Sequence, residues 1–310
     1  MHFAFTEEQL SIAEAIDTVL SSECTPDVVR AAETERPTAL WATLAEVGLF
    51  AVHIDEDDGG LGLGMTDLVL ALERCGYHAV PLPVTDAIAL GPELEQAASV
   101  AEGELRVSIA VGGISQDADL ADILTAYTGT GITLGSGELV RQSSVDRARW
   151  AFSGLRPTDR LDIDADKVRQ RATLATAAQL LGGARRMLDM ATAYAKARRQ
   201  FGKPIGAQQA VQHRLADALL ALSFATPAVH RAALSLDATA DTVDRDVSMA
   251  KVLASDAARV VRGAALQVHG AIGYTIECDL QLWLTRSIVL ESLWGTAGSH
   301  RSRVADQLDL

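Results

Sequence analysis

Hydrophobic residues recur every three or four positions along most of the chain, which is the spacing of helices that bury one face. In residues 1–98 this pattern predicts an N-terminal helical domain. Its apolar positions include Leu10, Ile16, Leu20 and the segments 40–47 and 68–75. Thr6 and Gln9 come just before the first of these helices with the spacing of a capping box, in which each side chain satisfies the backbone amide of the other residue.

An acidic and then glycine-rich stretch, residues 55–64, separates two of these helices. It does not match the dinucleotide-binding pattern G-x-G-x-x-G, because the third glycine would fall on Met65 and no strand leads into it. The composition predicts a turn between helices, with glycines at positive φ.

The pattern changes over residues 99–165, where Val107, Ile109 and Val111 alternate with other residues and the segment 127–134 is rich in Thr, Ile and Gly. Alternation and this composition are typical of short strands. We expect a small, shortened β middle domain here.

Residues 166–310 return to long helical stripes, so the fold class is mainly α, with a C-terminal four-helix bundle. The four stripes are Leu174, Leu181 and Leu188; Val211, Leu215, Leu219 and Leu222; Met249, Leu253, Val260 and Ala264; and Leu280, Leu284 and Ile288.

Charge and composition narrow the class of protein. The chain has 27 basic and 41 acidic residues, a net charge of −14, which repels nucleic acid. Its three cysteines are widely spaced and odd in number, and His213 and His269 have no Cys or carboxylate at metal-ligand spacing, so no disulfide framework or metal site is predicted. No stretch reaches the about 18 apolar residues of a membrane span, and we expect a soluble, cytoplasmic protein.

The segment 194–213 carries the candidate chemistry. Gly202 and Pro204 read as a helix stop, which would place Arg198 and Phe201 on one face at the helix end. With the amides of Gln200 and Gln209, this set suits a phosphate-bearing aromatic ligand. The helix dipole alone also favours an arginine in a last turn, so from the residues themselves a purely structural role stays open.

This segment, Arg198-x-x-Phe201-Gly202-x-x-Ile205, resembles the signature of the acyl-CoA dehydrogenase family. Three further segments resemble the family in the same order, namely 5–9, 48–62 and 267–274. The resemblance implies FAD-dependent α,β-dehydrogenation of an acyl-CoA thioester. It also implies that the adenosine end of each FAD is held by a neighbouring subunit.

The positions of this chain that match the neighbour-donated set are Arg198, Gln200, Phe201, Gln209, Gln267, Gly270 and Ala271. Ala271 stands where the family often has a second glycine.

The family's catalytic base has no counterpart here. In many members a glutamate precedes a Gly-Thr near the C-terminus, but Trp294 precedes Gly295-Thr296. In another branch the base lies on the first bundle helix, at about Ala172 of this chain. We assign no catalytic residue; Glu291, one helical turn before Trp294, is the only substitute that we consider.

The middle segment is also short, and it lacks counterparts of the family's flavin-contacting Glu-Pro-x-x-Gly-Ser loop and Trp-Ile-Thr strand. The chain keeps the adenosine-side residues but lacks the base and the flavin-contacting segments. By the resemblance, this implies that it is one subunit of an α2β2 heterotetramer with a paralogous chain. In this combination of retained and lost features the chain resembles the steroid side-chain dehydrogenases of actinobacteria. The sequence of its segment 279–286 also resembles that group. Two alternatives stay open: a self-sufficient homo-oligomer using Glu291, and a non-catalytic assembly subunit.

Overall fold

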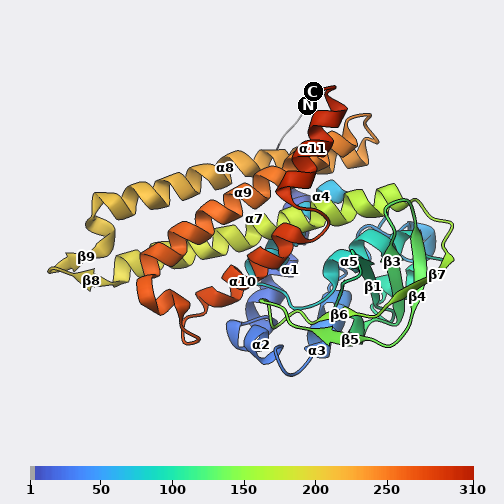
Figure 1. Ribbon diagram of the computed structural model, residues 1–310, viewed down its shortest axis with the longest axis horizontal. Helices are drawn as coiled ribbons and strands as arrows, with labels where there is room; N and C mark the ends of the chain where they lie inside the picture. Colours follow the sequence, from blue (N-terminus) through green and yellow to red (C-terminus); the bar gives the residue numbers. More distant parts are fainter. Residues whose placement is uncertain (1–3) are drawn as a thin grey trace.

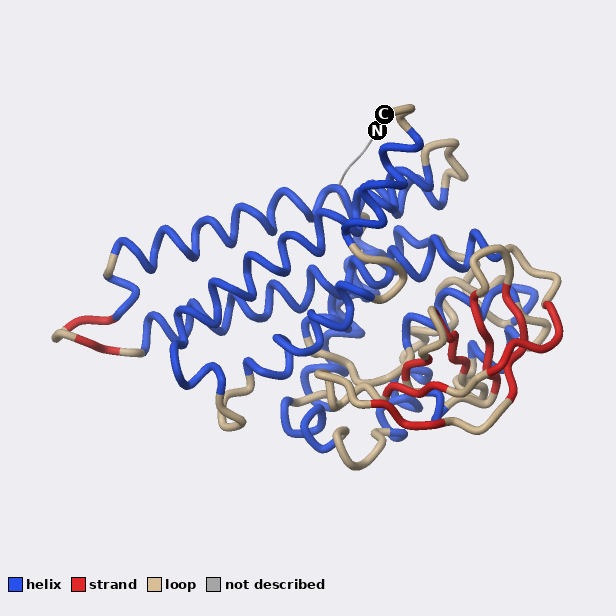
Figure 2. Tube along the Cα trace, viewed as in Figure 1, coloured by secondary structure: helices blue, strands red, loops and turns tan. Residues whose placement is uncertain are grey.

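A computed structural model describes residues 4–310 of the chain. Long helices run side by side through the molecule, and the N-terminal helices and the strands gather against one half of them (Figure 1). Figure 2 shows how strongly helix predominates over strand. The predicted class, mainly α with a small β part, is confirmed.

The N-terminal part is helical, as predicted. Its helices are α1 (Glu7–Glu23), α2 (Pro26–Ala31), α3 (Thr38–Glu46), α4 (Met65–Tyr77), α5 (Val84–Leu90) and α6 (Ala97–Ala101). The capping box is present: the Thr6 amide donates to Gln9 Oε1 over 3.0 Å, and the Gln9 amide donates to Thr6 Oγ1 over 3.2 Å. The glycine-rich stretch is a turn between α3 and α4, in which Gly59 and Gly62 have φ of 77° and 62°.

Two small sheets form the β part. One has the order β1-β3-β4-β7 and the other β2-β6-β5. The strands are β1 (Val107–Val111), β2 (Ser115–Gln116), β3 (Ile123–Tyr127), β4 (Ile132–Ser136), β5 (Val140–Gln142), β6 (Ala151–Ser153) and β7 (Arg156–Arg160). β1 pairs in parallel with β3, and the other pairs in these sheets are antiparallel.

The bundle consists of α7 (Ala165–Ala197), α8 (Gln209–Asp237), α9 (Val243–His269) and α10 (Leu280–Ser292), followed by α11 (Ala297–Gln307). The predicted stripe of α7 is correct, since Leu174, Leu181 and Leu188 are buried.

The stripe predicted for α9 is largely wrong, because Met249, Leu253 and Val260 are exposed. The stripe predicted for α8 is mostly correct: Leu222 is buried, and Val211 and Leu215 pack partly buried against the core, whereas Leu219 is exposed. Ile288 of α10 is also exposed. The buried faces are instead rich in alanine: Ala218, Ala225, Ala232 and Ala233 on α8, and Ala250, Ala254, Ala257, Ala258, Ala264 and Ala265 on α9. Small residues let the helices pack closely, so the larger apolar side chains are left on the outside of the bundle.

Of the helices in residues 4–310, α8 alone is long and apolar enough to cross a membrane by length and composition. Only 33% of its most apolar window is buried. In the structure α8 lies along α9 in the bundle (Figure 1), and core helices of other proteins share these properties.

The N-terminal helices join the bundle where α4 crosses α7. A Cβ atom on Gly182 of α7 would lie 1.8 Å from the carbonyl oxygen of Glu73, and one on Gly76 of α4 would lie 2.1 Å from that of Gln179. The indole N–H of Trp283 on α10 donates to the Tyr77 carbonyl at the same place, over 2.9 Å. Only glycine permits this backbone contact.

We expect Gly182→Ala to lower the free energy of unfolding by about 1–3 kcal/mol or more, because the methyl group forces the two backbones apart. Gly263→Ala is the matched control: Gly263 lies in α9 with no atom within 4 Å of its Cβ position, and alanine there should be neutral or stabilising. Urea unfolding of both variants makes the comparison. Equal stabilities would contradict the proposed constraint.

A buried carboxyl group links α5 to the first sheet. Asp86 Oδ2 accepts the Ile109 amide of β1 over 3.0 Å, and burial raises the pKa of Asp86 to about 7. In the unfolded chain this group titrates at about pH 4. The folded state therefore binds the extra proton between these values, and Asp86 should make stability fall as pH rises from about 4 to about 7.

Asp86→Asn removes this titration and keeps a carbonyl acceptor for Ile109. We expect the unfolding free energy of the variant to depend less on pH over this interval than that of the wild type. Parallel pH profiles from urea unfolding would show that Asp86 carries no raised pKa.

Candidate functional site

The segment after α7 forms a hairpin. Helix α7 ends at Ala197, and Arg198 caps it in an extended conformation. β8 (Arg199–Gln200) then pairs with β9 (Lys203–Pro204), and the Ile205 amide donates to the Arg198 carbonyl over 2.8 Å. Phe201 and Gly202, with φ of 51° and 80°, make the turn.

The predicted position of the helix end, at Gly202, is therefore wrong, because α7 already ends at Ala197. The positive φ predicted for Gly202 is correct. Arg198 and Phe201 do not share a helical face, because the ladder of the hairpin replaces the last helical turn and separates them.

A cleft of about 580 Å³ lies between this hairpin, the start of α8 and the end of α9. Five of the candidate cofactor residues line it: Arg198, Gln200, Gln267, Gly270 and Ala271. Residues more than 60 positions apart in the sequence thus meet at one place.

Two candidates do not line the cleft. Phe201 is 92% exposed at the hairpin tip, and Gln209 is exposed at the first residue of α8. Gln208, one position earlier, lines the cleft instead. Arg214 of α8 also lines the cleft and was not predicted from the sequence. The available signal was an arginine within two turns of the start of the helix that follows the motif.

The cleft is suited to an anion. Arg198 and Arg214 line it, none of the described lining residues is acidic, and neither arginine has a carboxylate partner in residues 4–310. Gly270 adds half-buried backbone at φ 64° and ψ −141°, with no atom within 4 Å of where its Cβ would be. In a chain of charge −14, this local arrangement fits a pyrophosphate group.

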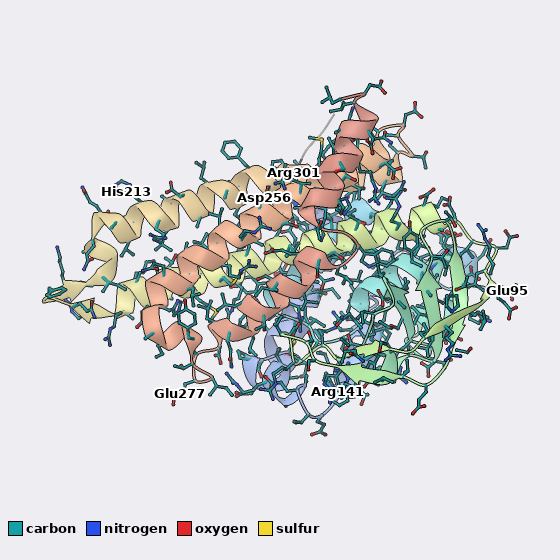
Figure 3. The ribbon with its side chains drawn as sticks, in the orientation of Figure 1. Glu95, Arg141, His213, Asp256, Glu277 and Arg301 are labelled. Carbon is teal, nitrogen blue, oxygen red and sulfur yellow. The ribbon has the colours of Figure 1, made fainter. Side chains whose placement is uncertain are left out.

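His269 belongs to the wall of the cleft as a structural group. Its ring stacks on Tyr194 with centroids 4.6 Å apart, and Nδ1 lies 2.8 Å from the Ala265 carbonyl oxygen. His213 is exposed on α8 and points outward (Figure 3). No group of three His, Cys, Asp or Glu side chains in residues 4–310 could hold a metal ion.

The positions considered for a catalytic base offer none. Ala172 is buried within α7. The Glu291 carboxylate is bound by two guanidinium groups of α9, those of Arg262 and, over 3.3 Å, Arg259. A carboxylate held by two cations is engaged in a structural ion-pair network and is not free to contact a substrate.

Trp294, which occupies the place before Gly295, is buried at φ 58° with its ring against Tyr127 of β3, the centroids 5.6 Å apart. The bulky side chain fills the junction between the bundle and the β part.

A buried lysine holds this turn. Lys251 Nζ of α9 donates to the carbonyl oxygens of Leu290, Glu291, Leu293 and Gly295 over 2.7, 3.2, 2.9 and 3.1 Å. Burial lowers the pKa of Lys251 to about 7, and the negative charge of Glu291 opposes this shift. The lysine thus caps the carboxyl end of α10 and fixes Trp294 in position.

Comparisons of the sequence agree with this architecture. Residues 6–97 match the family profile described as acyl-CoA dehydrogenase, N-terminal domain, and residues 169–308 match acyl-CoA dehydrogenase, C-terminal domain. Acyl-CoA dehydrogenase IpdE2 of Mycolicibacterium smegmatis is 31% identical over 299 residues, which cover 91% of this chain and 93% of the relative.

Comparisons of structure give the same fold. The ChsE4-ChsE5 complex from Mycobacterium tuberculosis contains a chain with a TM-score of 0.88 and 22% identity, covering 100% of this chain and 99% of that one. A chain of the Tcur3481-Tcur3483 steroid ACAD G363A variant has a TM-score of 0.86 and 22% identity, with 98% of both chains covered.

We expect Glu291→Gln to lower the free energy of unfolding by about 2 kcal/mol, because it removes the charge that two arginines bind. Acyl-CoA dehydrogenase turnover should stay within a few-fold of wild type. Glu277→Gln, at an exposed position without an ion pair in the described chain, is the control for both measurements. A loss of turnover by orders of magnitude at Glu291 alone would identify it as the base after all.

Proposed function

This chain belongs to the acyl-CoA dehydrogenase family, and we propose that it is the subunit of a two-chain member that holds the adenosine and pyrophosphate end of FAD while a paralogous partner supplies the base. As a family member it is a component of a flavoprotein oxidoreductase, and FAD is its cofactor. The bound flavin supplies the acceptor for the hydride that leaves the β carbon of the acyl-CoA.

The observation that carries this proposal is the cleft beside the hairpin, which is lined by arginines and amides and stays open in the single chain. Arg198 and Arg214 would neutralise the pyrophosphate, and the Gln200 and Gln267 amides would orient the nucleotide. Arg198, Gln200 and Gln267 are all exposed, and nothing in the described chain covers Phe201. These residues form half of a site that a second chain would complete.

The missing base supports the same division of roles. Trp294 fills the expected position, and Glu291 is engaged by arginines. Abstraction of the α proton then needs a carboxylate from elsewhere, and in this proposal the paralogous chain provides it.

The outer face of the bundle supports the existence of a partner. Leu219, Leu220 and Phe224 of α8 are exposed by 50%, 55% and 69%, and Met249 and Leu253 of α9 by 42% and 37%. Patches of this kind mark protein interfaces in soluble chains. We propose that the bundle of the partner covers it in an α2β2 heterotetramer.

The proposed substrate follows the relatives. Two chains with this fold come from two-chain complexes, and one of these is described as a steroid ACAD. We propose a bulky, steroid-derived acyl-CoA thioester in lipid and steroid catabolism. A cytoplasmic location fits three cysteines that form no disulfide.

Expression with and without the paralogous chain tests the proposal. We expect a yellow complex with bound FAD and acyl-CoA dehydrogenase activity from the pair, and no tightly bound FAD in this chain alone. In the complex, Arg214→Ala should weaken FAD binding about tenfold or more, through loss of a charged hydrogen bond. Arg156→Ala, at an exposed position on β7, is the control.

Two results would contradict the proposal. One flavin per protomer and full turnover in this chain alone would favour a self-sufficient enzyme. Absence of FAD from both the single chain and the pair would favour a non-catalytic assembly subunit.

A further inference from the structure

A second cleft lies far from the cofactor cleft, beside β5, where Arg141 is labelled (Figure 3). Its volume is about 480 Å³, within the size range of small-molecule sites. Three arginines and two serines line it, together with two acidic residues: Arg141, Arg147, Arg149, Ser143, Ser144, Glu33 and Asp146. It shares no lining residue with the cofactor cleft.

The acidic side chains around this cleft are already paired. The buried Asp117 binds Arg36 and Arg149, and Asp146 binds Arg286. Glu33 lies 3.1 Å from Arg147. Each carboxylate is therefore neutralised by a guanidinium group of its own.

Arg141 is the cation without such a partner: no carboxylate in residues 4–310 forms an ion pair with it. Its guanidinium carbon lies 3.5 Å from the ring centroid of Trp150, and Nη2 donates to the Glu33 carbonyl over 3.4 Å. Trp150 is itself fixed, because its indole N–H donates to the Ala32 carbonyl over 3.0 Å and Arg36 lies on the ring at 5.0 Å. The charge of Arg141 is thus held in place over a rigid platform.

Two hydroxyl groups stand beside this cation. Ser143 and Ser144 line the cleft and make no hydrogen bond with any described residue. A stacked guanidinium that keeps free N–H donors, next to unpaired hydroxyl donors, is the donor set that binds phosphate oxygens. Since the chain carries a charge of −14, the attraction for an anion here must come from this local set.

We propose that this cleft, defined by Arg141, Ser143, Ser144 and Arg147, is a binding site for a terminal phosphate group. Arg141 acts as the anchor, Arg147 at the rim keeps the charge of Glu33 neutralised, and the two serines donate to the remaining phosphate oxygens. The phosphate can belong to free inorganic phosphate or to the 3′-phosphate of CoA, and both have the same chemistry at the site.

Calorimetric titration of the full chain at constant ionic strength tests the site, with inorganic phosphate, CoA and 3′-dephospho-CoA as probes. We expect Arg141→Ala to weaken phosphate binding about tenfold or more. Arg141→Lys should restore only part of it, since an ammonium lacks the planar fork. The double variant Ser143→Ala, Ser144→Ala should weaken binding less. Arg141 is exposed, so these variants should fold normally.

Two arginine variants serve as controls. Arg156→Ala makes the same charge change on an exposed strand of the same β part, and it should leave binding unchanged. Arg198→Ala removes a cation from the cofactor cleft, so it reports any anion binding there, and it should leave the Arg141-dependent component of binding unchanged.

The probes distinguish the source of the group. Arg141-dependent binding of CoA but not of 3′-dephospho-CoA supports the site and assigns it to the 3′-phosphate. Arg141-dependent binding of inorganic phosphate alone supports the site and assigns it to the free ion. If no probe binds, or if binding depends on Arg198 and not on Arg141, the proposal is overturned, whatever the outcome for FAD.

Discussion

The close crossing of α4 and α7 is the contact on which the arrangement of the molecule depends. Gly76 and Gly182 place each helix against the carbonyl groups of the other, and Trp283 adds a hydrogen bond from α10. Because α7 also contacts α5, α8 and α9, this crossing fixes the N-terminal helices and the β part along the first half of α7. The other end of α7 extends beyond them (Figure 1) and carries the hairpin with the cofactor residues into solvent.

The bundle has two apolar faces. The inner one stabilises the packing of its helices, and the outer one is the surface that we propose a second chain covers. Alanine-rich surfaces face inward on α8 and α9, so these helices approach closely. Larger residues such as Phe224 and Met249 lie outside. A helix with apolar residues on both sides is expected where a second chain covers the outer one.

The region near the C-terminus is specialised for structure. Lys251 satisfies the carbonyl groups at the end of α10, Glu291 binds two arginines, and Trp294 packs against Tyr127. These groups fill the place where a dehydrogenase of this family needs a free carboxylate. The cofactor cleft at the opposite end of α9 keeps its cations unpaired. An engaged carboxylate near the C-terminus and an open cleft lined by arginines at the other end are the physical basis of the proposed division between two subunits.

The sequence by itself determined what depends on neighbouring residues: the capping box at Thr6, the turn at Gly59 and Gly62, the helices of the bundle, and the motif around Arg198. It also showed that Trp294 stands where a base is expected. It did not determine which apolar stripe of α9 faces inward, because periodicity cannot tell a core face from an interface face. Nor did it find the hairpin at Phe201 or the contribution of Arg214, which require the hydrogen bonds of β8 with β9 and the packing of α8 against α9. The hairpin and the helix packing depend on contacts between residues that the chain brings together only in its tertiary structure.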